Sequence, residues 1–505
     1  MRLGLRQNGF HKQAIAAWGA LAIAWLFVFS SRPVTASRQP QDQPPPPSPN
    51  DVLVSMPGSA ALLYFPVIAG ASMEATEDLS DGWYLMIDDG HIAARDVQRV
   101  YHPFRKYSGN PIIEADKPWE GNAIQLYGSV LPGFKMWYSS YNYDGNPSSQ
   151  VLYAVSLDGL HWAKPGIGGS ASNAMFGGQN AAMVSVLRTQ FDPGKPYKLV
   201  AYQSGGFNGY WSVDGMQSSP YPENPLFANG SDVAQFYWDP YTGRYGGTTK
   251  ESAPLRGDTR RVVRFIGSDD LVGWDPVGEV LAPDIIDDQI YPGLYPNFYG
   301  LPVFAAGEQY LGLLWVLKAR EPSGLTGKIS IQLVSSHDGL TWTREEGNRP
   351  AILDVGPPGA WDDGQLYTAT QPLRVEDELW LYYSGCNMEH GASLRDTVCG
   401  IGLAKAPYHR LASLSGSGTV LTAALEPSGP ALRLNYDGSE GGLQVELLRG
   451  GVVIPGYEAA SCLPLTADRR DEIVRWQGQT GLPAGPIQIR FTLQNAALFA
   501  FRFED

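Results

Sequence analysis

The chain has 505 residues, which is enough for two or three domains. Its formal net charge of −14 excludes nucleic acid and anionic membrane surfaces as expected partners, because both repel an acidic protein. Hydrophobic residues make up 43% of the chain and Gly (58) and Pro (39) are abundant, which indicates a globular protein of many short strands joined by turns.

The first 36 residues predict a targeting segment. A basic start precedes an apolar stretch at 14–29 and small residues at 34–36, which is the pattern of a cleaved signal peptide. The alternative is an uncleaved anchor that tethers the protein to a membrane through residues 14–29. In both cases we expect an exported protein, periplasmic or extracellular. Residues 37–51 are rich in proline and predict an extended linker.

Residues 52–118 predict a strap that leads into a repeat at 119–410. A Ser-x-Asp element recurs in steps of 56, 56 and 68 residues, at Ser156, Ser212, Ser268 and Ser336. A regular period of this size indicates a repeat architecture. Each unit contains several apolar runs typical of strands, and the Ser-x-Asp turn follows the last but one of them. This order predicts a four-stranded propeller blade.

We expect five blades, of which the fifth lacks the Ser-x-Asp element. In three units a Trp follows the turn and is expected to pack between blades. The turn aspartates are expected to bond the backbone of their own turns, which gives them a structural role. These aspartates are Asp158, Asp214, Asp270 and Asp338.

Residues 411–505 alternate apolar and polar side chains, which predicts a β-sandwich. The predicted fold class is therefore all-β, a five-bladed β-propeller followed by a C-terminal β-sandwich. Cys386 ends one strand-like run and Cys399 begins the next, so a disulfide across a hairpin is predicted, with two buried free thiols as the alternative. Cys462 is expected to be buried and unpaired.

This architecture resembles the furanosidase-type glycoside hydrolases of families 32 and 43. The resemblance covers residues 105–505 and is carried by the Asn-Pro segment Gly109–Ile113 and by the repeated turns. It implies an enzyme that cleaves a glycosidic bond with paired carboxylates. The chain departs from the Trp-Met-Asn-Asp-Pro, Arg-Asp-Pro and Glu-Cys motifs of family 32, since Phe191–Pro193 matches only the last two letters of the second. The family's catalytic residues therefore cannot be carried over by motif.

A ligand site is expected where the innermost strands of the blades begin, because these ends converge on the mouth of a central funnel. The catalytic candidates are Glu120, Asp232, Asp288 and Asp363, of which Asp363 is the first choice. The substrate-binding candidates are Trp119, Asn122, Gln179, Asn180, Tyr291, Trp361 and Asp362. Carboxylates and amides can bind sugar hydroxyls, and Trp rings can stack on the apolar face of a sugar.

Each candidate acid could instead be a turn former or a surface acid. The strap acids Asp88, Asp89 and Asp96 are a further group that could reach the funnel. Which carboxylate serves as acid or nucleophile, and whether the reaction retains or inverts, stays open because both depend on the separation of the carboxyl groups.

Two other functions fit the pattern less well. The first is a propeller that binds glycan without cleaving it. The second is a sialidase-like enzyme, which needs six blades, an arginine triad and a tyrosine nucleophile. The seven His residues show no metal-ligand spacing and the chain has no Gly-rich phosphate loop, so no metal and no cofactor are expected. The expected partner is an oligosaccharide or polysaccharide, bound by a monomer.

Overall fold

The computed structural model describes residues 51–54, 63–66, 75–142, 145–228, 231–322, 324–345 and 347–504. The predicted targeting segment at 1–36 and all but the last residue of the predicted linker lie outside these ranges. Two short strands, β1 (Asp51–Val54) and β2 (Leu63–Pro66), pair with each other. None of the helices in the described ranges is long and apolar enough to cross a membrane.

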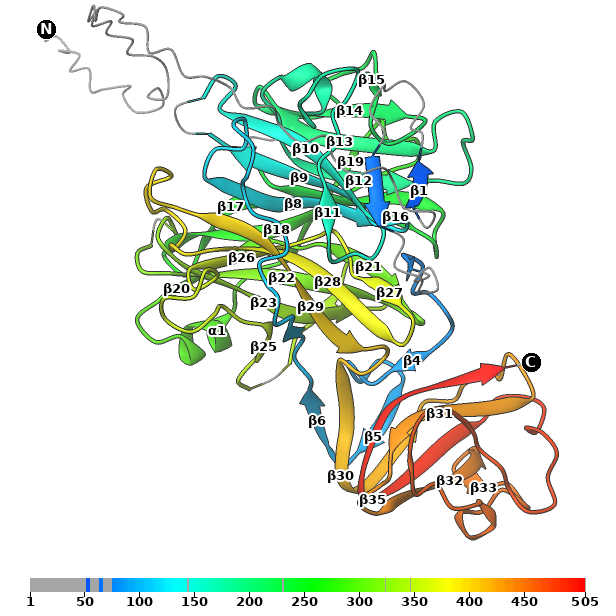
Figure 1. The fold of residues 1–505 in the computed structure, drawn as a ribbon. Helices are drawn as coiled ribbons and strands as arrows, with labels where there is room; N and C mark the ends of the chain where they lie inside the picture. Colours follow the sequence, from blue (N-terminus) through cyan, green and yellow to red (C-terminus); the bar gives the residue numbers. More distant parts are fainter. Residues whose placement is uncertain are drawn as a thin grey trace, which may run out of the picture. The chain divides into compact units, whose positions relative to one another are not determined.

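Antiparallel strands between residues 123 and 407 form five successive groups in the described chain, here named blades one to five (Figure 1). Blades two and three are separate four-stranded sheets, and blades one, four and five are joined into one 16-stranded sheet. Blade one contains β8 (Ala123–Leu131), β9 (Lys135–Tyr141), β10 (Ser149–Ser156) and β11 (Trp162–Ala163). Blade two contains β12 (Ala182–Arg188), β13 (Tyr197–Gln203), β14 (Gly206–Ser212) and β15 (Ser218–Pro220). Blade three contains β16 (Ala234–Asp239), β17 (Arg244–Leu255), β18 (Asp258–Ser268) and β19 (Asp275–Leu281).

The innermost strand of the last two blades is interrupted, so that two short strands pair in turn with one neighbour. Blade four contains β20 (Tyr295–Gly300), β21 (Val303–Ala306), β22 (Gln309–Ala319), β23 (Gly327–Ser336), β24 (Trp342–Thr343) and β25 (Ala351–Leu353). Blade five contains β26 (Gln365–Thr368), β27 (Leu373–Val375), β28 (Glu378–Cys386) and β29 (Cys399–Pro407).

The ring is completed by strands from the start of the chain. β7 (Arg105–Lys106) pairs with β29 as the outer strand of blade five, and β3 (Ala75–Thr76) pairs with β27. Each blade contacts the next in cyclic order, and blade five meets blade one where Cys399 pairs with Ala123. The predicted five-bladed propeller is confirmed. We call the end at which β8, β12, β16, β20 and β26 begin the mouth, and the opposite end the exit.

The Ser-x-Asp elements are turns at the exit, as predicted. Ser156 is the last residue of β10, and Asp158 accepts hydrogen bonds from the backbone N–H of Leu160 and of His161, both at 2.8 Å. The corresponding aspartates of blades two, three and four accept the equivalent pairs of bonds; they are Asp214, Asp270 and Asp338. The turns therefore hold the aspartates in a structural role.

Neighbouring blades are fastened at these turns by aromatic side chains. The Tyr382 hydroxyl of blade five donates to the Gly159 carbonyl in the turn of blade one at 3.0 Å, and the Tyr382 ring lies 5.6 Å from that of Trp162. The Trp137 indole of blade one donates to the Gly215 carbonyl in the turn of blade two at 2.8 Å. The repeated sequence element thus serves both its own blade and the interface with the next one.

The axis of the propeller is filled below the mouth. The rings of Tyr127 and Tyr367 lie 4.3 Å apart, and Trp315 packs against both at 5.5 and 5.3 Å. All three side chains are buried, and the Trp315 indole donates to Thr368 Oγ1 at 3.1 Å. A ligand on the mouth side therefore meets an aromatic floor.

The strap differs from its predicted course. β4 (Tyr84–Leu85) pairs with the last strand of the chain, and β5 (Ile92–Arg95) and β6 (Gln98–Tyr101) pair with the first strand after the propeller. These segments therefore extend the C-terminal sheet. They are too short, and too polar in β5 and β6, to show an alternating pattern in the sequence.

The C-terminal residues form the predicted β-sandwich, in which one long strand is shared. The first half of β35 pairs with β32 and its second half with β31, while β30 pairs along its middle. The strands are β30 (Ala412–Thr422), β31 (Ala431–Asp437), β32 (Gly442–Arg449), β33 (Val452–Val453), β34 (Asp468–Ile473) and β35 (Gln488–Glu504). Cys462 is buried in its core and is a free thiol.

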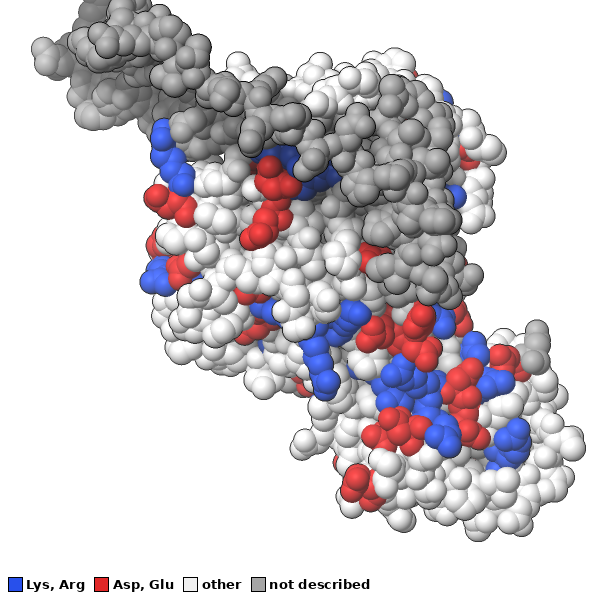
Figure 2. All heavy atoms as spheres, viewed as in Figure 1, with Lys and Arg blue, Asp and Glu red and all other residues white. Residues whose placement is uncertain are grey.

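Charged side chains on the C-terminal strands are mixed in sign. Figure 2 shows basic and acidic groups next to each other over this part of the protein, where Arg433 pairs with Asp471 and with Glu504. Arg502 pairs with the same two acids. On this face of the described residues, basic groups lie among acidic ones.

We predict that the turn aspartates stabilise the fold only while they are ionised. Burial raises the pKa of Asp158 and of Asp338, but backbone N–H groups and nearby side chains outweigh it and lower the pKa to about 2. Asp158→Asn combined with Asp338→Asn keeps an acceptor oxygen in each turn and should lower the melting temperature at pH 7 by about 2 °C.

The difference between this double variant and the parent should shrink as the pH falls from about 4 to about 2, because the parent then loses the charge-dependent stability. Thermal unfolding across that range measures it. A difference that is the same at pH 7 and pH 2 would contradict this account.

Candidate functional site

A carboxylate stands at the mouth, just ahead of blade three's innermost strand. Asp232 lies two residues before β16, and its Oδ1 is 2.6 Å from Nζ of Lys250 on β17. Its side chain is 47% exposed, whereas that of Lys250 is 11% exposed. Asp232 therefore combines a cationic partner with access to solvent, which a residue must have to meet a ligand.

Two further blades supply an aromatic ring and a histidine to the same place. Lys250 Nζ lies 4.3 Å from the centroid of the Tyr299 ring, which is on β20. The His390 ring from blade five lies 4.8 Å from the Tyr299 ring, and its Nε2 is 3.1 Å from the Tyr299 hydroxyl. Arg261 of β18 lies 5.4 Å from the same ring centroid. We call these five residues, Asp232, Lys250, Arg261, Tyr299 and His390, the mouth cluster.

The electrostatics of the mouth cluster keep its acid ionised and its histidine neutral. Burial raises the pKa of Asp232, but the charge and hydrogen bond of Lys250 outweigh it and hold this pKa below its usual value. Burial lowers the pKa of His390 to about 4, and the charges of Arg261 and Lys250 act in the same direction. At neutral pH, Asp232 is thus a carboxylate and His390 an uncharged imidazole.

The contacts of His390 define its tautomer. Its Nδ1 faces the Leu325 carbonyl, which can only accept a hydrogen bond, so Nδ1 carries the proton. Its Nε2 then accepts from the Tyr299 hydroxyl. Arg261 donates to the Gly324 carbonyl and makes no ion pair with a carboxylate of the described residues.

The loop that carries His390 is closed by the predicted disulfide, which is present. Cys386 ends β28, Cys399 begins β29 and their sulfur atoms are bonded 13 residues apart in sequence. The Asn122 amide donates to the backbone carbonyls of Leu394, Arg395 and Thr397 at 3.2, 3.0 and 2.9 Å. Asn122, expected to bind substrate, therefore holds this loop against blade one.

Glu120, a catalytic candidate, is completely buried in blade one. Its carboxylate accepts from the backbone N–H groups of Asp116 and Lys117, from the Tyr138 hydroxyl at 2.7 Å and from Lys164 Nζ at 2.8 Å. These partners use its acceptor capacity and leave no surface for a ligand. Glu120 is placed as a structural anion.

Asp288, a second catalytic candidate, lies on a helix and not at a strand entrance. Asp284 caps α1 (Ile285–Ile290) by accepting from the backbone N–H of Ile286 and of Asp287, and Asp287 returns a bond to the Asp284 N–H. Asp288 on this helix pairs with Arg256 at 2.9 Å and with Arg260 at 3.3 Å.

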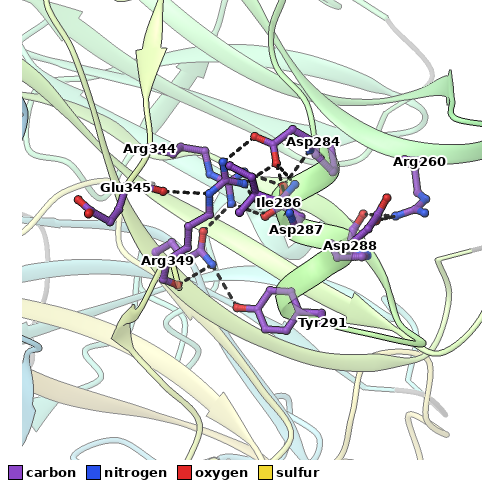
Figure 3. A network of polar contacts seen from close by, with 12 residues as sticks. Arg260, Asp284, Ile286, Asp287, Asp288, Tyr291, Arg344, Glu345 and Arg349 are labelled. Atoms are coloured by element: carbon purple, nitrogen blue, oxygen red, sulfur yellow. Dashed lines mark hydrogen bonds and ion pairs between the residues drawn. The ribbon is translucent and has the colours of Figure 1, made fainter. Parts of the chain in front are cut away.

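Figure 3 shows how α1 is fixed on its other side. Asp287 is fully buried and receives two bonds of 2.7 Å from Arg344, while Arg349 binds Asp284. Tyr291, a substrate-binding candidate, follows the helix, and its hydroxyl accepts from Gln332 at 3.2 Å. These residues form a polar network within blade four.

The paired acids ahead of β26 also have partners of their own. Asp363 pairs with Lys328, which holds the pKa of Asp363 below its usual value, and accepts from the Gly359 N–H at 2.9 Å. Asp362 is buried and lies 2.5 Å from Lys106 Nζ and 3.0 Å from the Tyr383 hydroxyl. The first-choice candidate, Asp363, therefore forms its ion pair with a residue outside the mouth cluster.

The remaining binding candidates line other surfaces. Trp361 packs against Tyr383, with ring centroids 5.7 Å apart. Asn180 is exposed and accepts from the Ser148 N–H at 2.8 Å, and Gln179 beside it is also exposed. Trp119 is partly buried, and its indole donates to Asn173 Oδ1 at 2.8 Å.

The strap acids do not reach the mouth. Asp88 lies 2.9 Å from Nε2 of His337, which belongs to the exit turn of blade four. Asp89 pairs with Arg95 in the strap, and Asp96 accepts from the backbone of the first sandwich strand. These contacts place the three acids at the exit and beside the sandwich.

Sequence reasoning missed four members of the mouth cluster. Lys250 and Arg261 lie inside strands, Tyr299 inside an innermost strand and His390 in a loop, so none has a motif around it. The one available signal was the pair of cysteines, which marks a constrained loop that ends beside the start of β8. The roles of the predicted site residues stay predictions.

Comparison with known proteins identifies no relative by sequence. No protein-family model matches the chain. No curated protein matches it either. The glycoside hydrolase families that the architecture resembles are therefore not shown.

Solved structures of similar architecture exist at low similarity. A GH130 structure, from a family of mannoside phosphorylases that contains glycoside hydrolases targeting β-1,2 mannosidic linkages in Candida mannan, covers 61% of this chain and 97% of its own with 14% identity and a TM-score of 0.44. A glycosyl hydrolase from Bacteroides ovatus covers 60% and 94% with 14% identity and a TM-score of 0.42. An N-acetylgalactosamine deacetylase from F. plautii, in complex with blood group B trisaccharide, covers 63% and 96% with 16% identity and a TM-score of 0.39. We base no functional argument on likeness at this level.

We predict that Glu120 serves stability. Glu120→Gln leaves Lys164 without its buried counter-charge, with only the exposed Asp116 beside it, and should lower the free energy of unfolding by about 3 kcal/mol, measured by urea denaturation. Adding Lys164→Met should restore part of the loss. Glu120→Gln with unchanged stability but no ligand binding would show that Glu120 acts in the site.

We predict that the disulfide, which closes the loop that carries His390, stabilises the folded protein. Replacing both Cys386 and Cys399 with Ser should lower the free energy of unfolding by about 3 kcal/mol, as expected for a closed loop of this length. The same loss should follow when the parent is reduced with dithiothreitol. An equal stability of the parent with and without reductant would refute this role.

Proposed function

We propose that the protein binds a saccharide at the mouth of the propeller and acts on its glycosidic bond, with Asp232 as the reacting carboxylate. The observation that carries the proposal is the convergence of Asp232, Lys250, Tyr299 and His390 from three blades above the aromatic floor, where the Asp232 side chain is 47% exposed. A few convergent polar groups beside aromatic side chains are common in small-ligand sites.

The charge states assign roles to the mouth cluster. An ionised Asp232 can activate water or attack a sugar carbon, but it cannot protonate a leaving group. Lys250 holds Asp232 in place and ionised. Arg261, which lacks an acidic partner in the described chain, can bind hydroxyl or carboxylate oxygens of the saccharide, and His390 can bind a hydroxyl group.

Glycosidic hydrolysis with paired carboxylates needs a second carboxyl group as acid. Glu120, Asp288 and Asp363 each pair with a cation outside the mouth cluster. Of the four catalytic candidates, Asp232 alone belongs to the described mouth cluster. This observation favours a second candidate function, in which the mouth binds a saccharide without cleaving it.

We further propose that the protein is exported. The support is the disulfide between Cys386 and Cys399, since disulfides persist in oxidising compartments, together with the signal-like pattern of residues 1–36. In a reducing cytosol the protein would lose this disulfide, which closes the loop that carries His390.

The decisive pair of variants is Asp232→Asn and Asp363→Asn, since each removes a carboxylate that pairs with one lysine. On a panel of aryl glycosides and oligosaccharides, Asp232→Asn should reduce kcat/KM by about 100-fold or more, and Asp363→Asn should leave it within about twofold. Because the pKa of Asp232 is lowered, kcat/KM of the parent should hold down to about pH 4.

The same panel separates the two candidate functions. Binding by the parent without turnover, weakened by Asp232→Asn, supports a glycan-binding propeller. A loss of activity with Asp363→Asn and not with Asp232→Asn would overturn the proposed site.

A further inference from the structure

A cavity opens between blades one and two, and none of the mouth-cluster residues lines it. Its volume is about 660 Å³, and its walls come from the start of β10, the loop between β11 and β12 and the turn after β14. The side chains that matter are Trp119, Gln150, Ser172, Phe176, Met216 and Gln217. We call this cavity the interblade groove.

The Trp119 ring is held rigidly at one side of the interblade groove. Its indole donates to Asn173 Oδ1 at 2.8 Å, and the fully buried Asn173 amide donates in turn to the Tyr138 hydroxyl and the Tyr153 carbonyl. The neighbouring Glu120 carboxylate fixes the backbone on the same side. An aromatic surface that is already ordered loses little entropy when a ligand stacks on it.

The other aromatic wall is built with a strained backbone. Phe176 has a φ of 53°, a conformation that costs free energy for any residue other than glycine, and Gly177 and Gly178 follow with φ of 66° and 73°. The Phe176 ring stacks on Tyr210 at 4.2 Å, and Gln150 Nε2 donates to the Gly178 carbonyl at 3.2 Å. These contacts hold the ring at the groove.

The lining of the interblade groove carries no charge. Its polar groups are serine hydroxyls and glutamine amides, and Trp119 and Phe176 supply aromatic surface. Aromatic rings with neutral hydrogen-bonding groups suit the alternating apolar and hydroxyl surfaces of an uncharged sugar. This composition contrasts with the mouth cluster, which contains two cations and one carboxylate.

We infer that the interblade groove is a binding site for neutral sugar units of a polysaccharide chain. The inference rests on the proposed function in that the mouth would act on the same chain. Trp119 at the interblade groove lies four residues before β8, and β8 begins at the mouth. The groove would extend the proposed site to a polymer.

The test is affinity electrophoresis of the full chain in gels that contain levan, debranched arabinan, yeast mannan or dextran. The parent should be retarded by at least one of these neutral polysaccharides. Trp119→Ala should weaken the apparent affinity about tenfold, and Phe176→Gly, which removes the ring and relieves the backbone, should do the same. Phe191→Ala is the matched control, because Phe191 is 75% exposed on the exit side. Thermal melting checks that each variant is folded.

Asp232→Asn separates this inference from the proposed function. Retardation that persists in Asp232→Asn and falls in Trp119→Ala supports the interblade groove, whatever Asp232→Asn does to turnover. A parent that no polysaccharide retards, or a folded Trp119→Ala that is retarded as strongly as the parent, overturns it. Retardation that is lost in Asp232→Asn and kept in a folded Trp119→Ala also overturns it, because the polysaccharide would then bind at the mouth alone.

Discussion

A buried carboxylate costs several kcal/mol unless a cation and hydrogen bonds compensate it, and this cost decides which acids of the protein can meet a ligand. Glu120 has four protein hydrogen bonds and no exposed surface. Asp362 and Asp287 are likewise buried against lysine or arginine. Asp232 differs because its lysine is buried while the carboxylate itself is exposed. Asp116, Asp192 and Asp284 share this asymmetry, so the proposed site rests in addition on the position of Asp232 beside Lys250, Tyr299 and His390.

Most of the architecture could be predicted from the sequence because it repeats. The Ser-x-Asp turn requires the same short local contacts in each blade. The period, the turn and the role of Asp158 and its equivalents could therefore be predicted from the sequence. The course of the strap could not be predicted, because β5 and β6 pair with a strand that lies more than 300 residues later in the chain. Helix α1 was missed since its cap, Asp284, lies inside a run that also suits a strand entrance.

The sequence could predict at which end of the propeller a candidate site lies, but not which residues form it. Inner strands of a propeller must converge, which located the mouth, and the spacing of Cys386 and Cys399 predicted the bridge that closes its loop. An acid ahead of a strand, however, looks the same in sequence whether it is free or paired with a distant cation. Lys328 and Lys164 come from other parts of the chain, so the engagement of Asp363 and Glu120 was visible only in three dimensions.

The most direct measurement is a crystal structure of the Asp232→Asn variant soaked with an oligosaccharide that the parent binds. The account predicts a sugar ring beside residue 232 at the mouth cluster, with hydroxyl groups within hydrogen-bond distance of residue 232 and of His390. A sugar bound beside Asp363 or Asp288, away from the mouth cluster, would contradict it.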